Sequence, residues 1–263
     1  MRRLLGTVAL AVVCLSVAGC GDDESDTGSP GDGDGATPTG DVIDPGDSGD
    51  YTVEIDPANF TSVIDHPYLP IRPGTVWTYE ATGDDGEIEI ITVEVLDEYR
   101  IVMGVETIVV HDTVHDEDGE LIEDTFDWFA QDADGNVWYF GEDTASYDEG
   151  VASEAGAWEA GVDGALPGIV MPAEPTVSET GYRQEYLAGE AEDMGQIIAV
   201  DGSVSVPAGE FDDVIVTRDW TPLEPDVVEE KTYARGVGFV YETKAAGAGP
   251  GEEVALITFT AGS

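Results

Sequence analysis

Alternation between apolar and polar residues is the dominant pattern over most of this chain. Near its first strong example, Val76 and Thr78 point to one side, while Trp77 and Tyr79 point to the other. Side chains alternate in this way between the two faces of a β-strand. No segment shows helical periodicity over ten residues. The pattern predicts strands at 76–80, 87–96, three within 105–142, and then at 182–187, 195–200, 211–220, 227–234, 238–243 and 254–260.

Asp-Gly pairs separate many of the predicted strands. Both residues tolerate the positive φ that a type I′ turn requires, so Asp-Gly between alternating runs predicts a hairpin. In 87–96 the alternation slips at Ile90, which predicts a β-bulge there and a bend in the sheet. The Asp-Gly pairs occur at 85–86, 118–119, 134–135, 163–164 and 201–202.

Two segments interrupt the strand pattern. Residues 143–159 are rich in Ala and Glu and favour one short helix, although two glycines weaken it. Residues 165–179 hold three prolines and are expected to cross one side of a sheet as an irregular segment. The chain is therefore predicted to be all-β and to form a single domain over 51–263. Its expected architecture is a large curved antiparallel sheet, a half-barrel or open barrel, with at most one or two short helices.

His111, His115, Asp116 and Asp118 are the candidate metal ligands of the chain. On a strand the two histidines share a face, but at about 3.3 Å per residue their Cα atoms lie roughly 13 Å apart. Zinc bonds of about 2 Å do not span that gap without a bulge or another element. Two half-solvated surface histidines are therefore one interpretation. A transition-metal site completed by acids of a neighbouring strand is the other.

The acidic turns at 116–119 and 132–136 resemble Ca²⁺-binding loops in composition. An EF-hand loop needs ligands at positions 1, 3 and 5 and Gly at position 6, whereas Gly comes fourth in both turns. Hairpin turns account for both segments, and weak Ca²⁺ binding by clustered carboxylates stays open. No other cofactor is expected. No catalytic residue stands out either, because the motifs of serine hydrolases, phosphate-binding loops and zinc proteases are missing.

The candidate ligand-binding residues are aromatic side chains and arginines on strands. Arg218 and Arg235 share strand faces with apolar residues. Arginines in this setting pair with carboxylates or receive an anionic group of a ligand. An aromatic stripe lines either a ligand pocket or the core, and it consists of Phe126, Trp128, Trp138 and Phe140.

The start of the chain has the pattern of an export signal. A basic start and the apolar run Leu4–Val17 precede the small residues of Val17-Ala18-Gly19-Cys20. This segment resembles a bacterial lipoprotein signal with its lipobox. The resemblance implies that residues 1–19 are removed and that Cys20 is acylated and anchors the protein to a membrane. An ordinary secretory signal with a chance cysteine is the alternative.

Acidic residues dominate the rest of the chain. Residues 20–50 are predicted to form a disordered acidic tether, because Gly, Asp, Ser, Thr and Pro make up most of them. The formal net charge is −48, and removal of residues 1–20 leaves seven basic and 57 acidic residues, or −50. This balance argues against nucleic acid as a partner. A saline habitat, favoured by the spread of the acids, and Ca²⁺ binding by acidic surface loops both account for it.

Three pieces of the chain resemble a group of uncharacterised bacterial secreted and lipid-anchored proteins. They are Asp56–Glu80, Trp158–Pro175, and Val206–Trp220 together with Tyr233–Glu242. The resemblance implies a curved β-sheet domain. It brings no functional residues, because the group has no established activity. In fold only, the chain also resembles the half-barrel lipoproteins that carry lipid in the cell envelope.

These features predict a lipid-anchored protein of the bacterial cell envelope that faces the periplasm or the exterior. Its β-domain is expected to bind an apolar or amphipathic ligand, or an envelope protein, without catalysis. The alternatives are a carboxylate-dependent hydrolase, with or without Ca²⁺, and a purely structural surface protein. A void lined by Trp and Phe favours binding, whereas two close carboxylates in a groove favour hydrolysis. A solid core favours the structural role.

Overall fold

The computed structural model describes residues 51–83, 86–148, 151–153, 155–245 and 253–262. The predicted signal peptide at 1–19, the acylation site Cys20 and the tether at 20–50 lie outside these ranges. Within them the chain forms sixteen strands and one short 3₁₀ helix, η1 (Pro57–Asn59). The prediction of an all-β fold with a large antiparallel sheet is confirmed. No helix of the described part is long and apolar enough to cross a membrane.

The strands form one sheet of sixteen strands whose main path runs β10-β12-β13-β14-β15-β16-β2-β3-β4-β5-β6-β9-β11. Strands β1, β7 and β8 attach beside this path, at β5 and β6. Most neighbours in the sheet also follow one another along the chain, because tight turns join them. The bounds of the strands are β1 (Phe60–Thr61), β2 (Val76–Thr82), β3 (Ile88–Val102), β4 (Val105–Asp116), β5 (Leu121–Asp132), β6 (Val137–Asp148), β7 (Val151–Ser153), β8 (Trp158–Glu159), β9 (Leu166–Met171), β10 (Tyr182–Arg183), β11 (Glu185–Tyr186), β12 (Met194–Val206), β13 (Gly209–Trp220), β14 (Val228–Ala234), β15 (Gly238–Lys244) and β16 (Glu253–Thr260).

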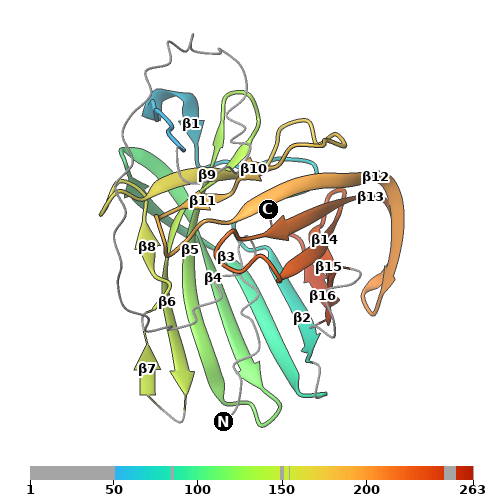
Figure 1. Cartoon of the computed structure of the whole chain (residues 1–263). Coiled ribbons are helices and arrows are strands. Elements are labelled where there is room, and N and C mark those ends of the chain that lie inside the picture. The colour runs from blue at the N-terminus through green and yellow to red at the C-terminus, as the bar shows by residue number, and fades with distance from the viewer. Residues whose placement is uncertain (1–50, 84–85, 149–150, 154, 246–252, 263) are drawn as a thin grey trace.

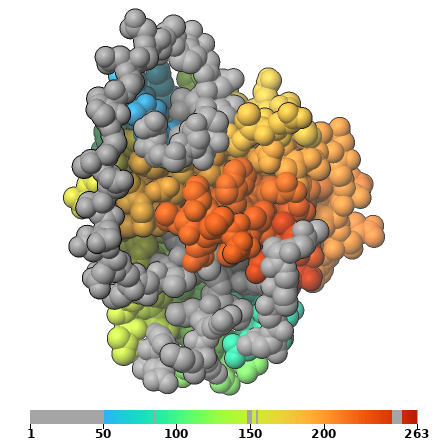
Figure 2. All heavy atoms as spheres, in the orientation of Figure 1, coloured from blue at the N-terminus to red at the C-terminus, as the bar shows by residue number. Residues whose placement is uncertain are grey.

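One short segment brings the two ends of this sheet together. Strand β10 pairs with β12 at one end, and β11 pairs with β9 at the other, yet Gln184 alone separates β10 from β11. The sheet therefore curls into a nearly closed barrel, with β9, β10 and β11 side by side in Figure 1. Gly168 on β9 makes the approach possible, because a Cβ there would lie 2.4 Å from the carbonyl carbon of Gln184. The second half of the chain, yellow to red, forms much of the near surface (Figure 2).

The inner face of the barrel carries most of the core. On β3, Ile91, Val93 and Val95 are buried, while the residues between them are more exposed. Large aromatic side chains from several strands fill the same interior, and burying such side chains contributes much of the stability of a domain. Among them the rings of Phe129 and Tyr139 stack with centroids 5.0 Å apart.

The irregularities of the sheet differ from those predicted. Strands β2 and β3 pair without interruption past Ile90, so the bulge predicted there is wrong, and the register shift of β3 lies between Val95 and Tyr99. Asp201-Gly202 lies inside β12 at a register shift rather than in a hairpin. The alternation of apolar and polar residues breaks at Ile90 because β3 carries apolar residues on both of its faces there, including the partly buried Ile90.

The two interrupted segments also belong to the sheet. Residues 143–159 contain the end of β6, then β7 and β8, rather than a helix. Residues 165–179 were expected to be irregular, but β9 pairs with β6 through Met171, Ile169 and Gly168. Strand β7 pairs locally with the end of β6, whereas β8 and β9 pair with residues of β6 that lie outside their own segments. For β8 and β9, tertiary pairing overrides local propensity.

Candidate functional site

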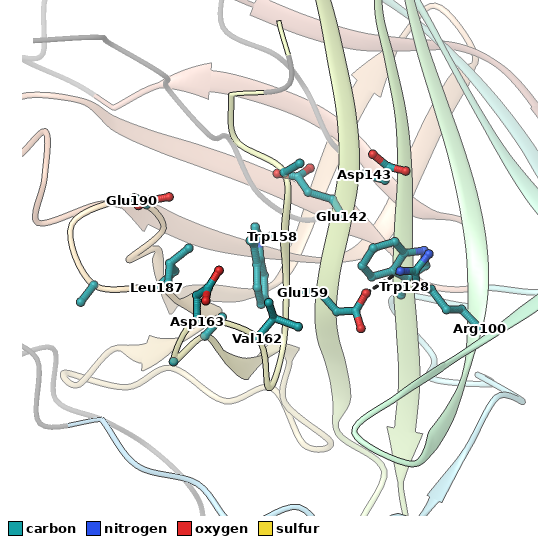
Figure 3. Close-up of a pocket in the computed structure, with 14 residues that line it drawn as sticks. Arg100, Trp128, Glu142, Asp143, Trp158, Glu159, Val162, Asp163, Leu187 and Glu190 are labelled. Carbon is teal, nitrogen blue, oxygen red and sulfur yellow. Dashed lines mark hydrogen bonds and ion pairs between the residues drawn. The ribbon is translucent and has the colours of Figure 1, made fainter.

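A groove of about 590 Å³ opens beside β6 and β8. Strand β5 contributes Trp128, β6 contributes Glu142, and β8 contributes Trp158 and Glu159. The turn before β9 and the loop after β11 supply the opposite wall. Figure 3 shows Trp158 standing between Leu187 of that loop and the strands that carry Glu142 and Trp128.

The groove depends on the close approach of β8 to β6. Glu142 pairs with Trp158, and Gly141 pairs with Glu159. Gly141 has a φ of 125°, and a Cβ there would lie 2.3 Å from the carbonyl oxygen of Trp158. Glycine is therefore required at this position, both for its backbone conformation and for space. Trp158 is 5% exposed and packs edge-on against Tyr139, with ring centroids 5.3 Å apart.

Arg100 of β3 covers one tryptophan of the groove. Its guanidinium carbon lies 4.0 Å from the centroid of the Trp128 ring. The same guanidinium donates a hydrogen bond to Oε2 of Glu159, 2.5 Å away (Figure 3). The Arg100 side chain is 45% exposed. An exposed ion pair contributes little to stability, so this arrangement is easily displaced.

Carboxylates lie behind the groove on the inner face of the barrel. Asp127 of β5 is directly opposite Glu142 of β6, and Asp112 lies one strand further along, opposite Thr125. The Tyr139 hydroxyl donates to Oδ1 of Asp127 at 2.7 Å. Among the described residues, Oδ2 of Asp127 and both carboxylate oxygens of Asp112 have no hydrogen-bond partner.

Burial changes the proton affinity of these acids. Loss of hydration raises the pKa of Asp127 to about 7, while the hydrogen bond from Tyr139 acts against this rise and the charge of Glu123 adds to it. Burial also raises the pKa of Asp112 well above its ordinary value, and the neighbouring acidic charges raise it further. The inner face therefore combines negative charge with protons that are held near neutral pH.

The predicted aromatic stripe forms one face of the meander, but its members have different surroundings. Trp128 lines the groove. Phe60 packs edge-on against both Trp138 and Phe140, with centroids 5.9 and 5.5 Å away. Phe126 stacks on His111 at 4.3 Å. One of the four aromatic residues thus lies at the groove, and the other three pack against protein.

The two predicted arginines lie away from the groove. Arg218 donates to Glu230 of the neighbouring strand at 3.1 Å. Arg235 donates to Asp213 and, at 2.8 Å, to the hydroxyl of Tyr68. Arg235 also borders a second hollow of about 500 Å³. Both arginines have carboxylate partners, in keeping with the pairing interpretation of the sequence.

The candidate metal ligands are not gathered into one cluster. His111 Nε2 lies 2.6 Å from Oδ1 of Asp124, on the neighbouring strand. Asp116 Oδ1 accepts hydrogen bonds from the backbone N–H groups of Asp118 and Glu120, and the Asp118 side chain is exposed at the turn. His115 lies opposite Leu121. Within the described ranges, no group of three or more His, Cys, Asp or Glu could hold a metal ion.

Sequence reasoning missed most of the groove. Asp112 carries a recognisable signal, because it shares a strand face with Val110 and Val114, where an apolar residue is expected. Trp158 and Glu142 carry no such signal. They meet through β8, a strand of two residues that no periodic pattern can reveal.

Comparison with known proteins adds little. No protein-family model matches the chain, and no curated protein matches it. One similar solved structure, from Bacteroides fragilis, is provisionally described as an exported protein with a YmcC-like fold; it is 16% identical, with 74% of this chain and 99% of that chain covered and a TM-score of 0.41. Another, from Parabacteroides distasonis, is provisionally described as a lipoprotein; it is 13% identical, with 73% and 98% covered and a TM-score of 0.40. Scores this low carry no conclusion about this chain.

Proposed function

We propose that this chain is a lipid-anchored protein of the cell envelope whose β-domain binds an apolar or amphipathic ligand without catalysis. The observation that carries the binding role is the groove between β6, β8 and the Leu187 loop. Its volume of about 590 Å³ lies within the roughly 300–1,000 Å³ of small-molecule sites. Trp128, Trp158, Val162 and Leu187 supply apolar surface, and carboxylates surround them. The envelope location rests on the lipobox-like segment that ends at Cys20.

Ligand binding can be tested on the mature protein extracted from its own membrane. Native mass spectrometry under gentle conditions is expected to show a co-purifying small molecule. Val162→Arg, at a groove residue that is 48% exposed, is expected to remove this molecule by filling the groove. Val151→Arg introduces the same side chain at a 71% exposed position outside the groove and serves as the control. A clean protein mass, or a bound molecule that persists in Val162→Arg, contradicts the binding role.

The anchor requires a separate test. Cells fed an alkyne-bearing fatty acid are expected to label the protein, and Cys20→Ala is expected to abolish the label. The physical reason is that a thioether to Cys20 is the attachment point that the lipobox implies. Labelling that is unchanged in the Cys20→Ala variant excludes the anchor.

A carboxylate-dependent hydrolase is the second candidate, and one pair of acids favours it. Glu142 lines the groove. Asp127 lies opposite Glu142 on the neighbouring strand, and burial is the main cause that raises the pKa of Asp127 to about 7. A carboxyl with a raised pKa beside an acid that lines a cleft is typical of general acid–base sites. If this candidate is correct, the protein turns over aryl glycosides or aryl esters, and Glu142→Gln abolishes that turnover. If neither substrate class is turned over, the Glu142–Asp127 pair is not evidence for a hydrolase.

A further inference from the structure

Trp158 places a buried hydrogen-bond donor in the wall of the groove. It lines the groove and is 5% exposed, and within the described part of the chain its Nε1 has no hydrogen-bond partner. The indoles of Trp77 and Trp138 differ, because they donate to the carbonyl oxygen of Val237 and to Oδ2 of Asp132, each at 2.8 Å. Buried tryptophan N–H groups normally have such an acceptor. The indole of Trp158 therefore points to an acceptor that is not part of the described chain.

The neighbours of Trp158 give this part of the groove an apolar lining. Its ring packs edge-on against Tyr139, with centroids 5.3 Å apart, and stands between Leu187 and strand β6 in Figure 3. Leu187 and Val162 line the same groove. Trp158 lies directly opposite Glu142 in the β6–β8 pair, so these two side chains lie on the same face of the sheet. A ligand that lies along Leu187 and Val162 therefore passes the ring of Trp158.

The loop after β11 forms the movable wall beside this ring. Residues 188–190 are exposed, and Leu187 is partly exposed. Nε1 of Trp158 is covered by neighbouring atoms, so a ligand reaches it only when a side chain of the groove moves. Changes of side-chain rotamer are common on binding. Rotation of Leu187 is the change that fits, because this side chain stands next to Trp158 at the surface.

The charges of the groove restrict the kind of acceptor. Among the described residues, Arg100 is the one basic residue that lines the groove, and it already donates to Glu159. The carboxylates that line the groove are Glu142, Asp143, Glu159, Asp163 and Glu190. A carboxylate or phosphate of a ligand is repelled by this excess of negative charge, and an ammonium group cannot accept a hydrogen bond. The acceptor that fits Trp158 is therefore an uncharged oxygen.

We infer that the ligand of this groove is a neutral acyl ester or acyl amide whose carbonyl oxygen accepts a hydrogen bond from Nε1 of Trp158. This inference rests on the proposed binding role of the groove and names the chemical class of its ligand. A carbonyl is favoured over an ether because its oxygen carries more negative partial charge. The acyl chain lies along Leu187 and Val162, which supply apolar surface in the lining.

Three probes that share a ten-carbon chain separate the carbonyl from apolar binding. They are monodecanoylglycerol, which has an ester carbonyl, decylglycerol ether, which lacks it, and decanoate, which is anionic. Each is added to the mature protein in 0.15 M NaCl, below the concentration at which the probe aggregates. Calorimetric titration is expected to show the ester binding about 10-fold more tightly than the ether, because the ester pairs a buried donor. Decanoate is expected to bind more weakly than the ester.

Variants then locate the effect at Trp158. Trp158→Phe keeps an aromatic ring and removes the N–H, so it is expected to abolish the preference for the ester over the ether. This preference is the readout, since a loss of apolar contact weakens both probes alike. Trp138→Phe is the matched control, because that indole is already paired with Asp132 outside the groove, and it should leave the preference unchanged.

The wild-type protein supplies a second readout, which serves if Trp158→Phe does not fold. The chain has five tryptophans, and one indole N–H resonance in a ¹⁵N NMR spectrum is expected to move downfield when the ester is added. A new hydrogen bond to a carbonyl has this effect on the donor proton. The ether should move the same resonance much less, and an equal movement with both probes contradicts the inference.

The outcomes separate this inference from the proposed function. If the ester and the ether bind the wild type equally, or if the preference survives in Trp158→Phe, the carbonyl inference is wrong while the binding groove stands. If decanoate binds as tightly as the ester, the ligand class is not restricted to neutral molecules, and the inference is again wrong. A preference that is lost equally in Trp138→Phe does not arise at Trp158 and overturns the inference too. If none of the three probes binds, both the inference and the proposed function fail.

Discussion

A single carboxylate explains why one acidic turn resembles a calcium loop. Asp132 accepts five hydrogen bonds, from the backbone N–H groups of Asp134, Gly135 and Asn136, from the Asn136 side chain and from the indole of Trp138. These donors use the lone pairs that a cation requires. The acid therefore organises the β5–β6 hairpin and ties it to the aromatic stripe.

Replacing this acid should destabilise the protein. Asp132→Ala leaves these donors without their acceptor, and we expect a loss of about 3 kcal/mol in the free energy of unfolding. Asp116→Ala in the β4–β5 turn is the matched comparison, because Asp116 accepts from the two backbone N–H groups of Asp118 and Glu120. Its loss should be smaller, about 1 kcal/mol. Urea unfolding measures both, and equal losses would contradict the central role of Asp132.

Asp127 makes the stability of the protein depend on pH. Its pKa is about 7 in the folded chain, raised chiefly by burial from an ordinary value of 3.8. Between these values the folded state holds a proton that the unfolded state has lost, so the free energy of unfolding falls as the pH rises from about 4 to about 7. Asp127→Asn keeps an acceptor for Tyr139 but cannot ionise. It should therefore be more stable than the wild type at pH 8 and similar to it near pH 4.

Chemical unfolding at a series of pH values tests this. Asp143→Asn, at an exposed carboxylate on β6, is the control and should leave the pH dependence unchanged. A wild-type curve and an Asp127→Asn curve with the same slope between pH 4 and pH 7 would falsify the assignment.

Among the elements, the long strands were predictable and the short ones were not. Strand β13, for example, was expected at 211–220 and spans Gly209–Trp220, because its alternation is read directly from its own residues. The turn at Met103-Gly104 was not foreseen. Both residues adopt positive φ, of 50° and 84°, as in a type I′ hairpin, although methionine rarely does so. Here the pairing of β3 and β4 imposes a conformation that the local sequence does not favour.

The groove was less predictable than the sheet. Trp128 was identified from its place in the aromatic stripe, but Arg100 and Glu159 were not connected to it. Their contact depends on β8 and on Gly141, where close approach decides the geometry. Long-range contacts of this kind leave no periodic signal in the sequence. Barrel closure is equally hidden, because β10 and β11 have two residues each.

Closure of the barrel can be tested at Gly168. An added Cβ would lie 2.5 Å from the carbonyl oxygen of Arg183 and 2.4 Å from the carbonyl carbon of Gln184, both of them backbone atoms. Gly168→Ala should therefore separate β9 from the β10–β11 segment and lower the free energy of unfolding by about 2 kcal/mol. Hydrogen exchange of the amides in 182–186 should accelerate.

Gly202→Ala is the matched control for this variant. It is also inside a strand, and its added Cβ would lie 3.1 Å from a methyl group of Val214, farther than the backbone atoms that a Cβ at Gly168 would meet. Its stability loss should be smaller, and exchange in 182–186 should not change. Equal effects of the two substitutions on that segment would show that Gly168 has no special role in closure.

For the whole molecule, acids outnumber bases inside the barrel as well as on its surface. Lys231 is buried, and its Nζ lies 3.3 Å from Asp219, 4.0 Å from Glu229 and 3.8 Å from Glu242. One cation is thus shared by three acids. Burial similarly raises the pKa of Glu89 to about 7. Deprotonation of the buried carboxyl groups and repulsion between the surface carboxylates therefore both lower the free energy of unfolding.

The stability of the wild type should respond to this excess of negative charge. The full chain carries a formal net charge of −48, which favours expanded states through self-repulsion. Raised carboxyl pKa values add stability below neutral pH that is lost as the pH rises towards 8. Burial lowers the pKa of His66, so this residue reduces the stability of the fold as the pH falls below about 6.5. This effect comes from one group, whereas several carboxyl groups act in the other direction. The melting temperature should therefore be higher at pH 5.5 than at pH 8.5 in low salt.

Salt distinguishes the two explanations of the acidity. If screening is the cause, raising NaCl from 0.05 M to 1 M should raise the melting temperature at pH 8.5 more than at pH 5.5, because the Debye length falls to about 3 Å. Ca²⁺ and Mg²⁺ at equal millimolar concentration should then give equal shifts, since both screen alike. Ca²⁺ prefers six to eight oxygen ligands and Mg²⁺ keeps its water, so a specific calcium site would give a much larger shift with Ca²⁺. We expect equal shifts in melting temperature, because no group of three or more His, Cys, Asp or Glu in the described structure could hold a metal ion. A much larger shift with Ca²⁺ than with Mg²⁺ would favour the calcium interpretation of the acidic loops.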